Sequence, residues 1–160
     1  MNKSSGKFLI PITIIVGFVL QIMPMPSGID TYRPDWLLLV LCYWSMALPN
    51  RVGVGVTAVC GIVLDILYGT ALGVHSFAMA IPVFLVVANY QRLRNYSVIQ
   101  QAIMILVLGS LYHMIIFWLQ YWLTGIEFRF EYLFPVFTSI FIWPWLFWLL
   151  RKLRRAFGVS

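Results

Sequence analysis

The stretch SVIQQAIMILVLGSLYHMIIFWLQYWL, residues 97–123, contains no lysine, arginine, aspartate or glutamate. A membrane-spanning helix needs about 20 mostly apolar residues, so this stretch is long enough to cross a bilayer. The rest of the chain has the same character, because 62% of its 160 residues are hydrophobic and only 10% are charged. Soluble domains carry about 25% charged residues. The sequence therefore predicts an all-α protein that folds in lipid.

Five more apolar segments are separated by turn residues, such as Met-Pro-Met-Pro-Ser-Gly at 23–28, where proline cannot continue a helix. The basic start followed by an apolar stretch is not a cleaved signal peptide, since no small-x-small cleavage site follows it. We expect one integral membrane domain over 1–160, a six-transmembrane helical bundle without a soluble domain. Its predicted spans are 8–23, 34–49, 53–69, 72–90, 97–123 and 132–150.

Basic residues collect in alternate gaps between the predicted spans. With the N-terminus in the cytoplasm, nine of the 11 lysines and arginines are cytoplasmic, and only Arg33 and Arg129 are outside. This bias predicts that both termini are cytoplasmic. A re-entrant second segment would leave three basic residues inside and eight outside, so we reject that topology. The cytoplasmic set is Lys3, Lys7, Arg51, Arg92, Arg94, Arg151, Lys152, Arg154 and Arg155.

Asp65 is an acidic residue inside a predicted span. Small residues, Ala58 and Gly61 among them, share its helical face and would let a neighbouring helix approach closely. The third span runs outward and the fourth returns, so His75 lies at a similar depth and a contact with Asp65 is expected. Three interpretations stay open: a satisfied helix–helix hydrogen bond, a ligand or proton site, and a partner contact.

Further polar side chains fall in the middle or outer half of the membrane. Asp65, His75, His113 and Gln120 could line a polar cavity open to the outside, and a cavity in a bundle can hold a ligand or only waters. A lone histidine on an apolar helix is more often a packing residue than a ligand. The sequence does not decide between these possibilities.

The sequence lacks the common catalytic signatures. It has no G-x-x-x-x-G-K-[ST], no H-E-x-x-H and no C-x-x-C. Cys42 and Cys60 lie inside spans, where cysteine usually behaves as a small hydrophobe. We therefore predict no enzyme activity, cofactor, metal site or nucleic-acid partner. The basic tail is expected to anchor the chain to anionic lipid, through Arg151, Lys152, Arg154 and Arg155.

Three short motifs resemble the bacterial rod shape-determining MreD family. They are RPDWLLLVLCYW (33–44), LPNRVGVG (48–55) and GIVLDILYGTALGV (61–74), in the family's order and spacing. Trp143-Pro144-Trp145 and the basic tail are similar to the Gram-negative members. The resemblance covers the whole chain and is strongest over 33–80.

The resemblance implies a place in the machinery that elongates rod-shaped bacteria, in the inner membrane. Family members pair with the single-pass protein MreC. The assembly links MreB filaments to peptidoglycan synthases, a RodA-type polymerase and a class B penicillin-binding protein. The family's helices are also expected to resemble the substrate-binding subunits of energy-coupling-factor transporters, although fold alone does not carry function.

The start of the second predicted span is the first candidate surface for the MreC-like partner. Pro34 in the first turn and Asp35 beside the positive end of the helix dipole favour a well-formed helix start, which needs no function. The candidate partner surface comprises Arg33, Asp35, Trp36, Leu38 and Tyr43.

Two functions follow from these observations. The preferred one is a non-enzymatic membrane scaffold that maintains cell shape. The alternative is a binding or transport subunit that holds a small molecule or a lipid-linked wall precursor in the outward-facing cavity. A scaffold should be sensitive to changes on its helix surfaces, whereas a binding subunit should be sensitive at the polar residues of the cavity.

Overall fold

The computed structural model describes residues 3–23, 26, 32–49, 52–69, 71–125, 127 and 133–157, the side chains of 3–7 excepted. These residues contain no β-strand, and their longer regular elements are all α-helices. Asp30, Arg51, Arg129 and Glu131 lie outside the described residues. The helices are α1 (Lys3–Ile22), α2 (Trp36–Ala47), α3 (Val54–Tyr68), α4 (Val74–Ala88), α5 (Tyr90–Arg94), α6 (Val98–Thr124) and α7 (Phe134–Phe157).

Each of the six predicted segments contains one long helix, so the all-helical fold class is confirmed. The helix bounds differ most at the two ends of the chain: α1 begins at Lys3, and α7 continues past the predicted end at Leu150 to Phe157. The short helix α5 was not predicted. Lysine and arginine are good helix formers, so the basic segment after Leu150 can prolong the apolar part of α7.

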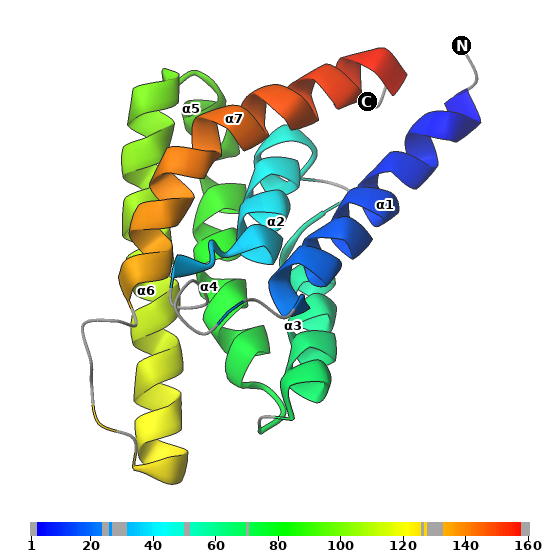
Figure 1. The fold of residues 1–160 in the computed structure, drawn as a ribbon. Helices are drawn as coiled ribbons and strands as arrows, with labels where there is room; N and C mark the ends of the chain where they lie inside the picture. The colour runs from blue at the N-terminus through cyan, green and yellow to red at the C-terminus, as the bar shows by residue number, and fades with distance from the viewer. Residues whose placement is uncertain are drawn as a thin grey trace.

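Consecutive long helices run in opposite directions (Figure 1). The start of α1, the end of α2, the start of α6 and the end of α7 lie towards the top of that view, and the end of α6 lies at the bottom. The tight turn between α3 and α4 depends on Gly69 and Gly73, whose φ angles of 70° and 102° suit glycine. At the start of α6, Ser97 and Gln100 form a capping box.

Helix α2 is the centre of the core. Eleven of its 12 residues are buried, and it packs against α1, α4, α5 and α7. Trp44 is fully buried, and its indole N–H donates to Thr13 Oγ1 of α1 at 2.9 Å. Because α2 is covered on all sides, none of its faces needs polar side chains, which explains why its sequence carries no amphipathic pattern.

The helices differ in length relative to a bilayer. By length and composition, α6 and α7 could each cross a membrane, whereas the apolar helical segments 8–22, 36–47, 54–68 and 74–88 are shorter. Helix α2 is about 18 Å long at 1.5 Å per residue, against a hydrocarbon core of about 30 Å. Helix length alone therefore does not establish six membrane crossings.

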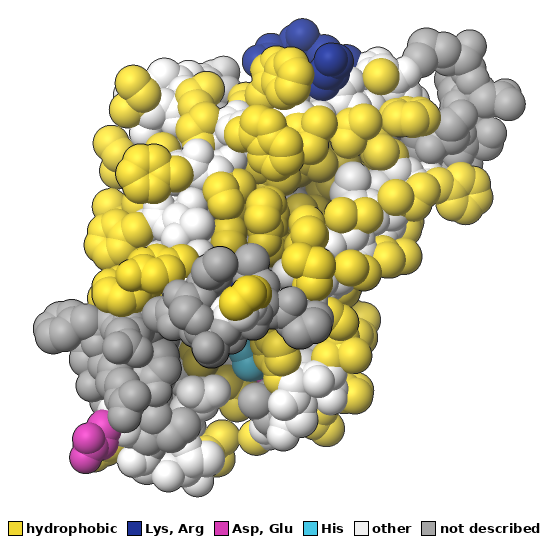
Figure 2. All heavy atoms as spheres, in the orientation of Figure 1, with side chains coloured by type: hydrophobic (Ala, Val, Ile, Leu, Met, Phe, Trp, Pro, Cys, Tyr) yellow, Lys and Arg dark blue, Asp and Glu magenta, His cyan; other side chains and the backbone are white. Residues whose placement is uncertain are grey.

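The exposed surface is predominantly apolar. Large apolar side chains are exposed on every long helix except α2, and Phe141 of α7 and Trp122 of α6 are 84% and 81% exposed. Soluble monomers rarely expose apolar surface this extensive. Figure 2 shows a broad hydrophobic band with lysine and arginine side chains at one end of the molecule. Such a band, bounded by a basic end, is the surface that a lipid bilayer solvates.

Candidate functional site

Asp65 of α3 and His75 of α4 form the first of two aspartate–histidine pairs. His75 Nδ1 lies 2.6 Å from Asp65 Oδ1, and the two side chains are 8% and 0% exposed. The Asp65 carboxylate also accepts the backbone N–H of His75 at 3.1 Å and of Gly73 at 2.9 Å. The expected contact between Asp65 and His75 is therefore present. The carboxylate also caps the first turn of α4, where negative charge is favourable.

The pair is possible because α3 and α4 approach closely. A Cβ atom at Gly61 would lie 2.2 Å from Ser76 Cα, so only glycine fits this crossing. Ser76 Oγ donates to the carbonyl of Ala58 on α3 at 2.9 Å. The small residues beside Asp65 thus admit the neighbouring helix, as the sequence predicted.

Asp35 and His113 form the second pair, which the sequence did not predict. His113 Nε2 of α6 lies 2.8 Å from Asp35 Oδ2, with the two side chains 14% and 7% exposed. The backbone N–H of Asp35 donates to Ser139 Oγ of α7 at 3.2 Å. Asp35 precedes α2 but makes no capping hydrogen bond to it. Its carboxylate instead connects the start of α2 to α6.

Aromatic rings connect the two pairs. The Tyr112 ring centroid lies 6.5 Å from that of His75 and 5.0 Å from that of His113. On the other side of His75, the ring of Tyr68 lies 5.3 Å away. Tyr68 also accepts a hydrogen bond from Gln21 Nε2 of α1 at 3.1 Å. The result is a polar layer, defined here as Asp65, His75, Tyr112, His113 and Asp35, that joins α2, α3, α4 and α6.

The four residues predicted to line an outer cavity have different neighbours in the structure. Asp65 and His75 pair with each other, His113 pairs with Asp35, and half-buried Gln120 lies two helical turns beyond His113. Four cavities of about 210 to 370 Å³ in the described part of the chain are lined by other residues. A ligand role for these four residues stays a prediction.

The surface predicted for a partner lies largely inside the protein. Leu38 and Tyr43 are only 3% and 1% exposed, and Trp36 is half-buried. Arg33 donates hydrogen bonds to the carbonyls of Gln21 and Met23, at the end of α1. The expectation of an exposed face on α2 is wrong. The sequence of an apolar helix does not show whether lipid or other helices of the protein surround it. Whether a partner binds near this segment stays a prediction.

The basic tail forms the last turns of α7 and lies close to other basic groups. Arg151, Arg154 and Arg155 line a cavity together with Arg94, which follows α4. Lys152 points elsewhere, with Nζ 4.9 Å from the Trp148 ring centroid. The distribution of basic residues along the sequence predicted that all of these residues lie on one side of the membrane. This prediction could have suggested that the arginines lie close together.

Metal ligands do not gather in the described part of the chain. Among those residues, no group of three histidine, cysteine, aspartate or glutamate side chains could hold a metal ion. Cys42 and Cys60 are buried free thiols.

Comparisons with known proteins identify the family. Residues 2–153 match the family model described as rod shape-determining protein MreD. A rod shape-determining protein MreD of Haemophilus influenzae is 34% identical over 141 residues, which cover 88% of this chain and 87% of that protein. The chain belongs to the MreD family. The resemblance of the sequence motifs is thereby confirmed, and with it a membrane protein that acts in determining rod shape.

No solved structure matches this MreD chain. The expected likeness to energy-coupling-factor subunits therefore stays a prediction. Within the MreD family assignment, the motif at 61–74 has a physical explanation, since Gly61, Asp65, Gly69 and Gly73 together build the α3–α4 hairpin. The motif at 33–44 supplies Asp35 and the buried helix α2.

Proposed function

We propose that this chain is a non-enzymatic scaffold of the rod-elongation machinery in the bacterial inner membrane. It binds an MreC-like single-pass protein and helps to couple MreB filaments to a RodA-type polymerase and a class B penicillin-binding protein. One observation carries the proposal: the buried Asp and His side chains bond to one another, while the exposed surface is apolar. Such a molecule offers surfaces for other membrane helices rather than a reaction centre.

Six crossings with both termini in the cytoplasm fit this role best. The six long helices alternate in direction (Figure 1), and the lysine and arginine side chains that Figure 2 shows lie at one end of the molecule. The shortest of the six long helices, α2, is enclosed by its neighbours and so does not need to match the bilayer thickness. Basic residues favour the cytoplasmic side, which orients this end inward.

Depletion of the protein in its own rod-shaped host tests the cellular role. We expect rods to widen into spheres while wall synthesis at division continues, and the original gene to restore rods. A small-molecule transport subunit would behave differently, because its loss would leave the shape intact and one added nutrient would restore growth. Normal rods after complete depletion would contradict the proposal.

Photocrosslinking tests the partner. An unnatural crosslinking residue is placed at exposed positions on separate helices, with buried Leu38 as the control: Phe8 on α1, Ile66 on α3, Trp118 on α6 and Phe141 on α7. We expect one helix face to capture the MreC-like protein and the Leu38 position to capture none. The variants must keep the cells rod-shaped. If none of the exposed positions in such cells captures the MreC-like protein, the proposal that the partner binds through the spans would be contradicted.

A further inference from the structure

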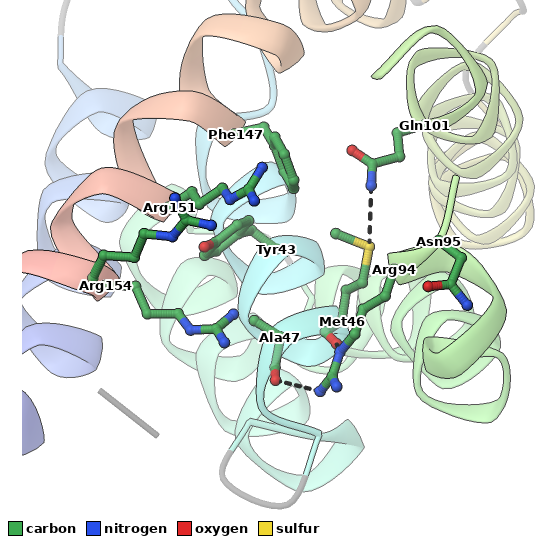
Figure 3. Close-up of a pocket in the computed structure, with 10 residues that line it drawn as sticks. Tyr43, Met46, Ala47, Arg94, Asn95, Gln101, Phe147, Arg151 and Arg154 are labelled. Atoms are coloured by element: carbon green, nitrogen blue, oxygen red, sulfur yellow. Dashed lines mark hydrogen bonds between the residues drawn. The ribbon is translucent and has the colours of Figure 1, made fainter. Parts of the chain in front are cut away.

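A basic cavity lies at the end of the molecule where α2 and α7 end and α6 begins. Its volume is about 320 Å³, within the range of small-ligand pockets. In Figure 3, Arg151 and Arg154 extend from α7 towards Tyr43 of α2, and Arg94 reaches towards Ala47 from the opposite side. Gln101 of α6 faces Met46 across the cavity.

The positive charge of this cavity is not neutralised by the residues around it. Among the residues that the structure describes, four arginines and no acidic residue line it: Arg94, Arg151, Arg154 and Arg155. Two of the described acids pair with histidines in the polar layer. Arg94 uses two of its five donors on the carbonyls of Met46 and Ala47, at 3.1 and 2.6 Å. Donors of all four guanidinium groups are left to bind an anion.

Two buried polar atoms, on two of the helices that line the cavity, also lack partners among the described residues. Gln101 is 1% exposed, and its Oε1 makes no hydrogen bond, while its Nε2 donates to the Leu93 carbonyl at 3.3 Å. Turning the amide over would set Oε1 against the Leu93 carbonyl oxygen, and two acceptors cannot share a hydrogen bond. Tyr43 is 1% exposed; its hydroxyl lies near the Arg154 guanidinium, which is a donor, and no acceptor for the O–H group is present among the described residues. Buried polar atoms normally have partners, so these two indicate a missing ligand.

The chemistry of the walls specifies that ligand. Guanidinium groups and the Tyr43 hydroxyl donate to the oxygens of a phosphate, and arginine is well suited to bidentate phosphate binding. Gln101 Oε1 needs a donor, which a phosphate diester lacks and a neighbouring hydroxyl supplies. The cavity also lies at the basic end of the apolar band, at the depth of lipid headgroups. We propose that it binds the phosphoglycerol headgroup of an anionic phospholipid, whose acyl chains lie along the apolar surface.

The binding test uses the full chain purified in detergent. Phosphatidylglycerol, phosphatidylcholine and soluble glycerol 3-phosphate are each added, and bound lipid is counted by native mass spectrometry. We expect phosphatidylglycerol to bind in preference to phosphatidylcholine, and glycerol 3-phosphate to displace it only weakly. Equal binding of the two lipids would overturn the proposal. Full displacement by glycerol 3-phosphate would overturn the lipid source and leave a soluble phosphate ester as the ligand.

Matched variants locate the site. Arg154→Gln removes a guanidinium from the cavity, and Lys152→Gln removes the same charge from the same helix outside it. A hydrogen bond to a charged group is worth about 1.5–3 kcal/mol, so we expect Arg154→Gln to weaken phosphatidylglycerol binding about tenfold or more, and Lys152→Gln much less. Equal weakening by both would show only general surface charge.

A third variant keeps the test decisive if Arg154→Gln does not fold. Tyr43→Phe removes one hydroxyl and keeps the buried ring in place against Phe147 and Trp44. We expect it to fold and to bind phosphatidylglycerol several-fold more weakly than the original chain. Unchanged binding by a folded Tyr43→Phe would contradict the proposed site. Cell shape is not a readout here, so the scaffold proposal and the lipid site succeed or fail separately.

Discussion

At the residue scale, Asp65 is held by the backbone as much as by a histidine. Its two oxygens accept the N–H groups of Gly73 and His75 as well as the His75 ring nitrogen. These two backbone N–H groups lie at the start of α4, where no carbonyl of the same helix can accept from them, so they require another acceptor. This geometry favours a structural hydrogen-bonding role over proton transfer among the interpretations that the sequence left open.

Replacing Asp65 separates these roles. Asp65→Leu leaves three buried donors without an acceptor, so we expect a loss of about 1–3 kcal/mol per unpaired group in the free energy of unfolding. Asp65→Asn keeps one acceptor oxygen and should lose less. The measurement is thermal unfolding of the purified variants, together with cell shape. A stable Asp65→Asn protein that fails to maintain rods would instead assign this residue a role in proton or ligand chemistry.

At the scale of elements, the α3–α4 crossing sets the position of the polar layer. Gly61 allows the two helices to approach until Ser76 contacts the backbone of α3. His75 is the neighbour of Ser76, so any separation of the helices also moves the histidine away from Asp65. The first Asp–His pair therefore depends on a residue that has no side chain.

Two glycine substitutions on α3 test this dependence. Gly61→Ala adds a methyl group where Ser76 Cα already lies, so we expect a loss of about 1–3 kcal/mol from overpacking, or more. Gly55→Ala, on the same helix, meets nothing within 4 Å and should be neutral or stabilising. Reversible unfolding of each variant in increasing concentrations of denaturant gives its free energy of unfolding. Equal stability of the two variants would show that the helices can separate without cost.

Elements close in sequence were predictable, and contacts between distant ones were not. The Asp65–His75 pair follows from a hairpin of two adjacent helices, so depth and spacing were enough to expect it. Asp35 and His113 are 78 positions apart, and their pairing depends on the tertiary arrangement that brings the start of α2 to α6. Hydrophobic content likewise cannot distinguish a helix buried in protein from one that faces lipid. The enclosure of α2 by other helices could therefore not be predicted from its sequence.

At the scale of the whole molecule, polar groups concentrate at two depths. The polar layer joins the helices internally, while four arginines from α5 and the last turns of α7 line the cavity beside the end of α2. Between and around them the exposed surface is apolar. This distribution gives the molecule a direction across the membrane, because basic residues favour the cytoplasmic side.

Cysteine labelling in intact cells tests that direction. Glu127 follows the end of α6 and Gln91 lies on α5, and both are exposed at opposite ends of the fold. With both termini in the cytoplasm, Glu127→Cys should react with a membrane-impermeant maleimide added from outside, and Gln91→Cys should react only after the cells are opened. The chain with its native Cys42 and Cys60 is the control, since both thiols are buried and should stay unlabelled. Labelling of Gln91→Cys but not Glu127→Cys in intact cells would invert the topology. That result would place the arginine cavity outside the cytoplasm, while the internal pairing of Asp35, Asp65 and the two histidines would stand.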